Sequence, residues 1–312
     1  MAEDKSVSRT AIWLALIGVY LGWGVIFLAN QYALRAFPAF LMNGARNLIA
    51  GVILYAFVML RGVKAPTVKM WKSAFVVSFI MICCGSGLNF WGQSMIPSGI
   101  SALLIGSTPL WMVILEIIIS KRAKTPGPTA LAIMGVIIGF AGIVFLIGPG
   151  NIVGAHTRLR PLGTVALLIG SFFWSAGSLK SRTAVLPSSR ILSAAMLMIT
   201  GGISLTVAGI LMGEPARFSP SNVTFSAIMG FTYGTLVSSV IAFSLYTWLL
   251  AVAPITLVST FAFVNPVVAV ILGVIVLKEA FSMHILVASL LILAAVAIVT
   301  VASGKKTVVK KP

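Results

Sequence analysis

Long apolar stretches divide this chain, and the short segments between them carry most of its charge. A membrane-spanning helix needs about 20 mainly apolar residues, and ten stretches of this kind can be traced. They run over residues 11–30, 37–60, 74–94, 98–120, 128–148, 162–181, 191–212, 224–248, 254–277 and 283–303. With 59% apolar and 9% charged residues, the composition lies outside the range of soluble domains. We therefore predict an all-α integral membrane protein with ten transmembrane helices.

The second half of the chain repeats a spaced pattern of prolines and a lysine from the first half. The repeated residues are Pro97, Pro109 and Lys121, then Pro254, Pro266 and Lys278. Because proline is costly inside a helix, prolines in register are harder to attribute to chance than apolar residues are. Five helices per half is an odd number, so the second half would enter the membrane from the opposite face. The pattern predicts two inverted five-helix repeats, over 11–148 and 162–303, an arrangement typical of alternating-access transporters.

Positive charge is unevenly shared between the two sides of the predicted membrane. Most of the 22 lysines and arginines fall on the side of the N-terminus, for example in 61–72, 121–124 and 305–311. The positive-inside rule then places both termini in the cytoplasm, and we expect a multi-pass protein of the cell membrane, namely a bacterial inner membrane. The net charge of +17 is explained by contact with anionic membrane lipid, and no nucleic-acid partner is expected.

Several short motifs carry a family resemblance. They are Trp23-Gly24, Gly44-Ala45-Arg46, Pro97 to Ala102, Thr108-Pro109, Asn265 to Val270, and Lys278-Glu279. With these the chain resembles the EamA-type transporters of the drug/metabolite transporter superfamily, ten-helix proteins made of two EamA repeats. The resemblance covers nearly the whole chain. It implies export of small solutes, such as amino acids or amphipathic compounds, through a central cavity with helices five and ten outside it.

The chain departs from the family pattern in one place. Lys121-Arg122 stands where Gly-Glu often ends helix four, which leaves Glu279 without a counterpart in the first half. The resemblance therefore implies no role that needs both carboxylates.

Pro109 and Pro266 lie near the middle of two spans and are predicted bends or hinges. Each removes the hydrogen bond to the carbonyl four residues earlier, at Ile105 and Ala262. A carbonyl freed at this depth must face a neighbouring helix, water or a solute. The bends therefore belong either to a binding site or to fixed packing of the helices.

Arg46 is the one cation well inside a predicted span, roughly 13 Å deep at 1.5 Å per residue. An unpaired guanidinium is costly there. Helix carbonyls or the flanking Asn43 and Asn47 would give Arg46 a structural role at the rim of the cavity. A substrate carboxylate would instead indicate an anionic or zwitterionic solute.

Further candidate substrate-binding residues are aromatic or polar groups near the presumed solute path. They are Tyr20, Trp23, Asn89, Trp91, Thr108, Trp111, Trp174, Tyr246 and Asn265. Interfacial belts are the ordinary explanation for tryptophan and tyrosine, but they fit mid-span tryptophans poorly. Bonding between helices accounts equally well for the amides. The glycines of 135–142 fit either a homodimer face or close packing within one chain.

Acidic residues number five, and none is placed at the middle of a span. Glu116 comes nearest, but Lys121 and Arg122 are close enough to pair with it at the interface. The sequence thus favours a facilitator, or an exchanger that uses neutral groups, over a proton antiporter based on a carboxylate.

An enzyme is not expected. His156 and His284 are isolated, so neither a metal site nor a cofactor is predicted, and Cys83-Cys84 fits packing. A membrane-embedded enzyme, or a structural membrane protein without transport, is the alternative function, and transport in liposomes would distinguish them.

Overall fold

The computed structural model describes residues 8–123, 127–147, 160–253 and 261–307, which are helical almost throughout. Undivided helices are α3 (Ala39–Leu60), α8 (Ala130–Ile147), α10 (Pro161–Ser181), α11 (Arg190–Leu211), α15 (Phe261–Leu277) and α16 (Met283–Thr307). Two pairs follow each other with a break, α1 (Arg9–Gly24) with α2 (Ile26–Ala33) and α6 (Ser98–Ile105) with α7 (Thr108–Ala123).

Two further rods are α-helical at both ends and π-helical in the middle. The first consists of α4 (Val68–Ser78), η1 (Phe79–Ser86) and α5 (Gly87–Gln93). The second consists of α12 (Phe225–Thr232), η4 (Tyr233–Ala242) and α13 (Phe243–Val252). The short 3-10 helices η2 (Glu214–Arg217) and η3 (Pro220–Asn222) connect α11 to α12.

Within the described residues, eight helical segments are long and apolar enough to cross a membrane. They are Arg9–Ala33, Ala39–Leu60, Val68–Gln93, Ser98–Lys121, Pro161–Ser181, Arg190–Leu211, Phe225–Tyr246 and Met283–Ala302. Two shorter apolar helices, Ala130–Leu146 and Val264–Leu277, fall on the fifth and ninth predicted spans. The prediction of an all-α multi-pass membrane protein is confirmed. The count of ten spans stays a prediction, and Pro254 lies outside the described residues, as does the rest of 254–260.

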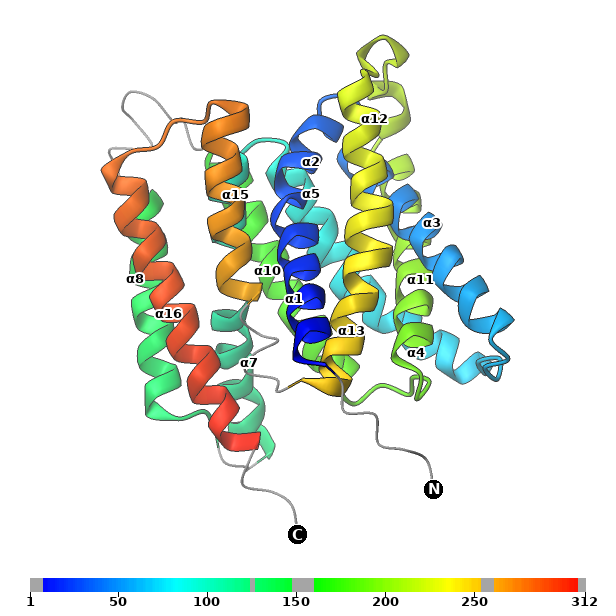
Figure 1. The fold of residues 1–312 in the computed structure, drawn as a ribbon, viewed down its shortest axis with the longest axis horizontal. Coiled ribbons are helices and arrows are strands. Elements are labelled where there is room, and N and C mark those ends of the chain that lie inside the picture. Colours follow the sequence, from blue (N-terminus) through cyan, green and yellow to red (C-terminus); the bar gives the residue numbers. More distant parts are fainter. Residues whose placement is uncertain (1–7, 124–126, 148–159, 254–260, 308–312) are drawn as a thin grey trace.

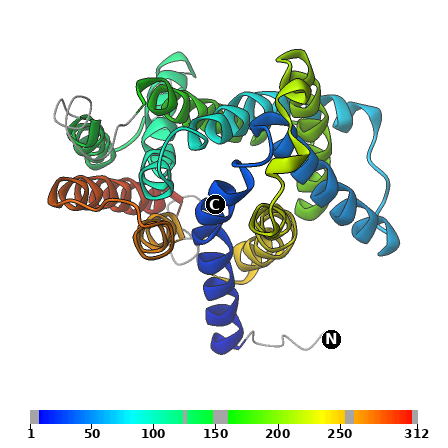
Figure 2. The same cartoon turned by 90° about the horizontal axis from the view of Figure 1, so that it is seen from above.

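The helices run side by side and place their connections at two opposite faces (Figure 1). We call the face where α1 begins and α16 ends the lower face, and the opposite one the upper face. The connection from α2 to α3 and the ends of α11 and α15 lie at the upper face (Figure 1). The α16 helix occupies one edge of the molecule in both views (Figures 1 and 2).

Three of the helix pairs pack along each other: α3 with α11, α8 with α16, and α6 with α15. Two further sets complete the arrangement. The α10 helix packs on the rod of η1 and α5 and also on α6 and α7. The α1 helix packs on the rod of η4 and α13 and also on α15.

Glycines permit a close approach of α3 and α11. A Cβ on Gly44 of α3 would lie 3.2 Å from the carbonyl oxygen of Gly202 of α11, and a Cβ on Gly202 would lie 2.9 Å from that of Gly44. Small residues let helix backbones meet in this way inside a membrane, where dispersion replaces the hydrophobic effect as the force between helices. The α3 and α11 helices are therefore held together face to face.

Candidate functional site

Helix irregularities gather well inside the membrane-spanning region. The first span breaks at Val25 between α1 and α2, and the fourth breaks at Gly106 and Ser107 between α6 and α7. The rods of η1 and η4 are π-helical in their central part. Interrupted helices at mid-depth are tolerated where they are buried in protein or line a cavity, and in transporters they mark binding sites. These segments define the candidate site.

Pro109 is the second residue of α7, next to this break in the fourth span. The carbonyl that it frees, that of Ile105, already accepts a hydrogen bond within the fold. The hydroxyl of Thr108 donates to the Ile105 carbonyl at 2.6 Å. The carbonyl of Thr108 in turn accepts the Ser175 hydroxyl of α10 at 3.0 Å. Thr108 is therefore engaged within the fold. The ring of Pro266 lies beside this break, since a Cβ on Gly106 would be 3.3 Å from Pro266 Cγ.

Three of the predicted aromatic residues meet in one cluster. The rings of Trp23 and Tyr246 are 5.0 Å apart, and Phe261 lies 5.0 Å from Trp23. Tyr20 packs on the same cluster. The indole N–H of Trp23 donates to the Ser238 carbonyl of η4 at 3.1 Å. The structure thus joins the first, eighth and ninth spans through aromatic contacts.

Arg46 lies in α3, seven residues from its upper end, which is roughly 10 Å along the helix. Its guanidinium carbon sits 4.7 Å from the centre of the Phe90 ring. A Cβ on Gly234 would come within 3.2 Å of Arg46 Cδ and 3.3 Å of Nη1. The buried Nε and Nη1 atoms have no hydrogen-bond partner among the described residues. A guanidinium in this state is costly unless an acceptor reaches it.

The other candidates are dispersed. Asn89 is buried with its Oδ1 unpartnered in the described structure. Asn265 is in the same state. The Trp111 ring packs edge-on against Phe140 and Phe172, at 5.0 and 5.6 Å, between the fourth, fifth and sixth spans. Trp174 is 36% exposed.

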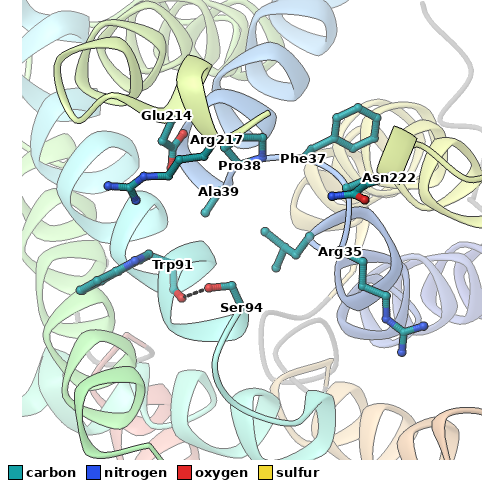
Figure 3. A pocket seen from close by; sticks show the side chains of 11 residues that line it. Arg35, Phe37, Pro38, Ala39, Trp91, Ser94, Glu214, Arg217 and Asn222 are labelled. Carbon is teal, nitrogen blue, oxygen red and sulfur yellow. Dashed lines mark hydrogen bonds between the residues drawn. The ribbon is translucent and has the colours of Figure 1, made fainter. Parts of the chain in front are cut away.

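Trp91 lies higher than the rest and lines a pocket of about 220 Å³ near the upper face. Glu214 and Arg217 stand on one side of this pocket, and Phe37, Arg35 and Asn222 stand on the other (Figure 3). The pocket holds no other predicted site residue. It therefore lies apart from the mid-depth site.

Two carboxylates at the upper face have roles that sequence reasoning missed. Glu279 accepts the backbone N–H groups of Ser98 and Gly99 at 2.6 and 3.1 Å, at the start of α6. Glu214 accepts those of Phe40 and Leu41 at 3.1 and 2.8 Å, at the start of α3. Both carboxylates come from the second half of the chain, and both helix starts belong to the first half.

A signal for these contacts was present in the sequence. Pro97 and Pro38 occupy the N-cap positions of α6 and α3, and proline has no side-chain acceptor to cap the helix. A carboxylate from elsewhere satisfies the free N–H groups and complements the positive end of the helix. Glu279 thus has a partner although the first half lacks a matching carboxylate.

The family model described as the EamA-like transporter family matches residues 9–148 and 161–301. The chain belongs to the EamA-like transporter family. The predicted resemblance is confirmed, and the family indicates a membrane transporter rather than an enzyme.

Known relatives agree with this assignment. The chain is 31% identical over 260 residues to the uncharacterized inner membrane transporter YedA of Escherichia coli K12, covering 83% of this chain and 80% of YedA. It is 23% identical to a WAT1-related chloroplastic protein of Arabidopsis thaliana, covering 94% of this chain and 70% of that protein. A crystal structure with 22% sequence identity matches the fold at a TM-score of 0.61, over 96% of this chain and 99% of that one.

Proposed function

We propose that this EamA-family protein is a secondary transporter that exports small metabolites by alternating access. Amino acids and amphipathic compounds are the proposed solutes. The solute would bind at the mid-depth site and leave through the upper face. The two halves would be the inverted repeats over 11–148 and 162–303.

The observation that carries this proposal is the way in which the helix contacts map onto themselves when the halves are exchanged. The contacts of α10 with η1 and α5 correspond to those of α1 with η4 and α13. The contacts of α10 with α6 and α7 correspond to that of α1 with α15. The pairs α3 with α11, α6 with α15 and α8 with α16 correspond to themselves. Such exchange symmetry supports two structural repeats. Because each half is predicted to have five spans, an odd number, the repeats would be inverted, and inverted repeats can exchange conformations to open one face or the other.

The charge pattern supports a cytoplasmic lower face. The described basic residues Arg61, Lys69, Lys72 and Lys121 belong to connections at that face or to adjoining helix ends. Positive charge near the ends of spans is typical of the cytoplasmic side. We therefore assign both termini to the cytoplasm and the protein to the inner membrane, and outward movement to the upper face is then export.

The bond between Glu279 and the start of α6 has a proposed part in this cycle. It ties the connection after α15 to the first turn of the broken fourth span. Carboxylate bonds to backbone N–H groups are stronger than neutral ones. We assign this contact to the closed state of the upper face.

Transport by the purified protein in liposomes tests the proposal. Uptake of labelled amino acids and amphipathic compounds should exceed that of empty liposomes. Uptake no greater than in empty liposomes, for a protein shown to be folded, would contradict it. This outcome would favour a structural membrane protein, or an enzyme acting on lipid.

Coupling is predicted not to need a proton gradient, because no mid-span carboxylate is present in the sequence. Flux should persist when the pH is equal on both sides, and Glu116→Gln should retain most of it. Flux abolished by Glu116→Gln in a stably folded protein would reverse this conclusion and make Glu116 a coupling group.

A further inference from the structure

Within the described part of the chain, the guanidinium of Arg46 is buried without enough hydrogen-bond acceptors. Two of its buried nitrogens, Nε and Nη1, are unpartnered in the described structure. The flanking amides do not serve it. Asn47 donates its amide to the carbonyl and Oδ1 of Asn43, both at 2.8 Å, and Asn43 donates to Ser86 Oγ at 2.9 Å. These bonds hold the amides to each other and to η1.

The carboxylates of the described residues do not pair with Arg46 either. Both oxygens of Glu214 and both of Glu279 are engaged by backbone N–H groups at the upper face. Glu116 belongs to the lower part of α7, and Glu3 and Asp4 lie outside the described residues. The local network thus leaves a buried positive charge without its counter-charge.

The arrangement around Arg46 fixes the guanidinium in place. The Phe90 ring covers it at 4.7 Å, a distance at which a cation is attracted to an aromatic face. Gly234, near the start of η4, supplies the other wall because it has no side chain to occupy the space beside Nη1. The group is therefore held between the second, third and eighth spans, close to the segments where the helices are irregular.

We infer that Arg46 binds the carboxylate of the transported solute, and that the solute is an organic acid or an amino acid. This inference rests on the proposed function. A carboxylate can bridge Nε and Nη2 on the side of a guanidinium or the two Nη atoms at its end. Each of these forks contains one of the unpartnered donors of Arg46. Bidentate pairing of this kind is strong and specific for the planar carboxylate.

Ligand-induced thermal stabilisation of the purified protein tests the inference without relying on transport. The probes are the L-amino acids and short mono- and dicarboxylates, each compared with its carboxamide. Wild-type protein should be stabilised by at least one carboxylate and not by the matching carboxamide. Arg46→Met should weaken that binding at least 10-fold, and Arg46→Lys should retain part of it. A wild type that no carboxylate stabilises contradicts the inference.

Arg61→Met is the matched control. Arg61 ends the same helix and also lies 4.7 Å from a phenylalanine ring, that of Phe57, but it is exposed. Its replacement should leave the carboxylate affinity unchanged. Equal losses in the two variants would show that the effect is general and would contradict a binding role for Arg46.

The thermal stability of ligand-free protein separates binding from a structural role. Removing an unpaired buried cation should leave the unfolding temperature of Arg46→Met at or above that of wild type. A fall of several degrees would show that the fold depends on the guanidinium and would overturn the inference. Should liposome uptake fail for every solute while carboxylates still bind through Arg46, the proposed transport falls, and a carboxylate-binding site at Arg46 remains without a transport role. If amines are taken up equally by wild type and Arg46→Met and no carboxylate binds, the proposed transport holds and the inference falls.

Discussion

Lys278 has an uncommon backbone conformation that places a functional side chain. Its φ is 56°, the only positive φ among the described non-glycine residues. Lys278 follows the last residue of α15, and the N–H of Glu279 then donates to the Gly273 carbonyl at 3.0 Å. A residue with positive φ directly after a helix is most often glycine. The turn directs Glu279 toward the start of α6.

Replacing Lys278 by glycine should stabilise the protein by about 1 kcal/mol, because glycine adopts this conformation without steric cost. The unfolding temperature in detergent should rise by roughly 2 °C. Lys121, its counterpart in the sequence repeat, lies within helix α7. Lys121→Gly should therefore lower the unfolding temperature. If Lys278→Gly and Lys121→Gly both stabilise the protein, or if neither does, the backbone of Lys278 is not strained.

Sequence reasoning identified Arg46 because one cation in a long apolar run stands out. It did not identify Phe90 or Gly234 as neighbours of Arg46, because both belong to other spans. Phenylalanine and glycine are also common in membrane helices, so neither residue stands out in the sequence. Which of the predicted site residues lie close together in space could not be predicted from the sequence for the same reason. Trp111 occupies a similar mid-span sequence position to Trp23, yet the packing of neighbouring helices turns the two rings toward different surroundings. Trp91 lies closer to a span end and lines the pocket near the upper face.

At the scale of elements, the spans themselves followed from the lengths of the apolar stretches, and the breaks followed only in part. Pro109 indicated the interruption of the fourth span, where the break lies at Gly106 and Ser107. The break at Val25 and the π-helical segments were not predicted. A π-helix differs from an α-helix only by a shift in hydrogen-bond partners, so tertiary packing rather than local composition decides it.

The π-helical segment η1 also contains the closest crossing of α10. A Cβ on Gly85 would lie 2.7 Å from the backbone nitrogen of Trp174 and 3.0 Å from its Cα. Backbone atoms of a packed helix cannot give way as a side chain can. Gly85→Ala should therefore destabilise the protein by roughly 1–3 kcal/mol, seen as a lower unfolding temperature in detergent.

Gly18→Ala is the matched control for this crossing. The added methyl group would meet only the Leu245 Cδ1 atom, at 2.7 Å, and this is the end of a flexible side chain. The effect on the unfolding temperature should be small. If the two substitutions have equal effects, the crossing of η1 with α10 does not limit the stability of the fold.

At the scale of the whole molecule, the helix contacts of the two halves are nearly symmetric, whereas the carboxylate contacts are not. The helix contacts are preserved when the two halves are exchanged, as in transporters built from internal repeats. The carboxylate contacts break this symmetry, because Glu214 and Glu279 both belong to the second half and both act at the upper face. The two faces should therefore open with unequal ease. The homodimer considered for the glycines of 135–142 stays a prediction.

The antiparallel arrangement of the two halves is the central claim. It is tested most directly by placing a single cysteine at Lys121 or at Lys278 in a cysteine-free protein and labelling intact cells with a membrane-impermeant maleimide. Lys278→Cys should be labelled from outside, and Lys121→Cys should be labelled only after the membrane is opened. Labelling of both cysteines from the same side would contradict the inverted repeats and the transport mechanism built on them.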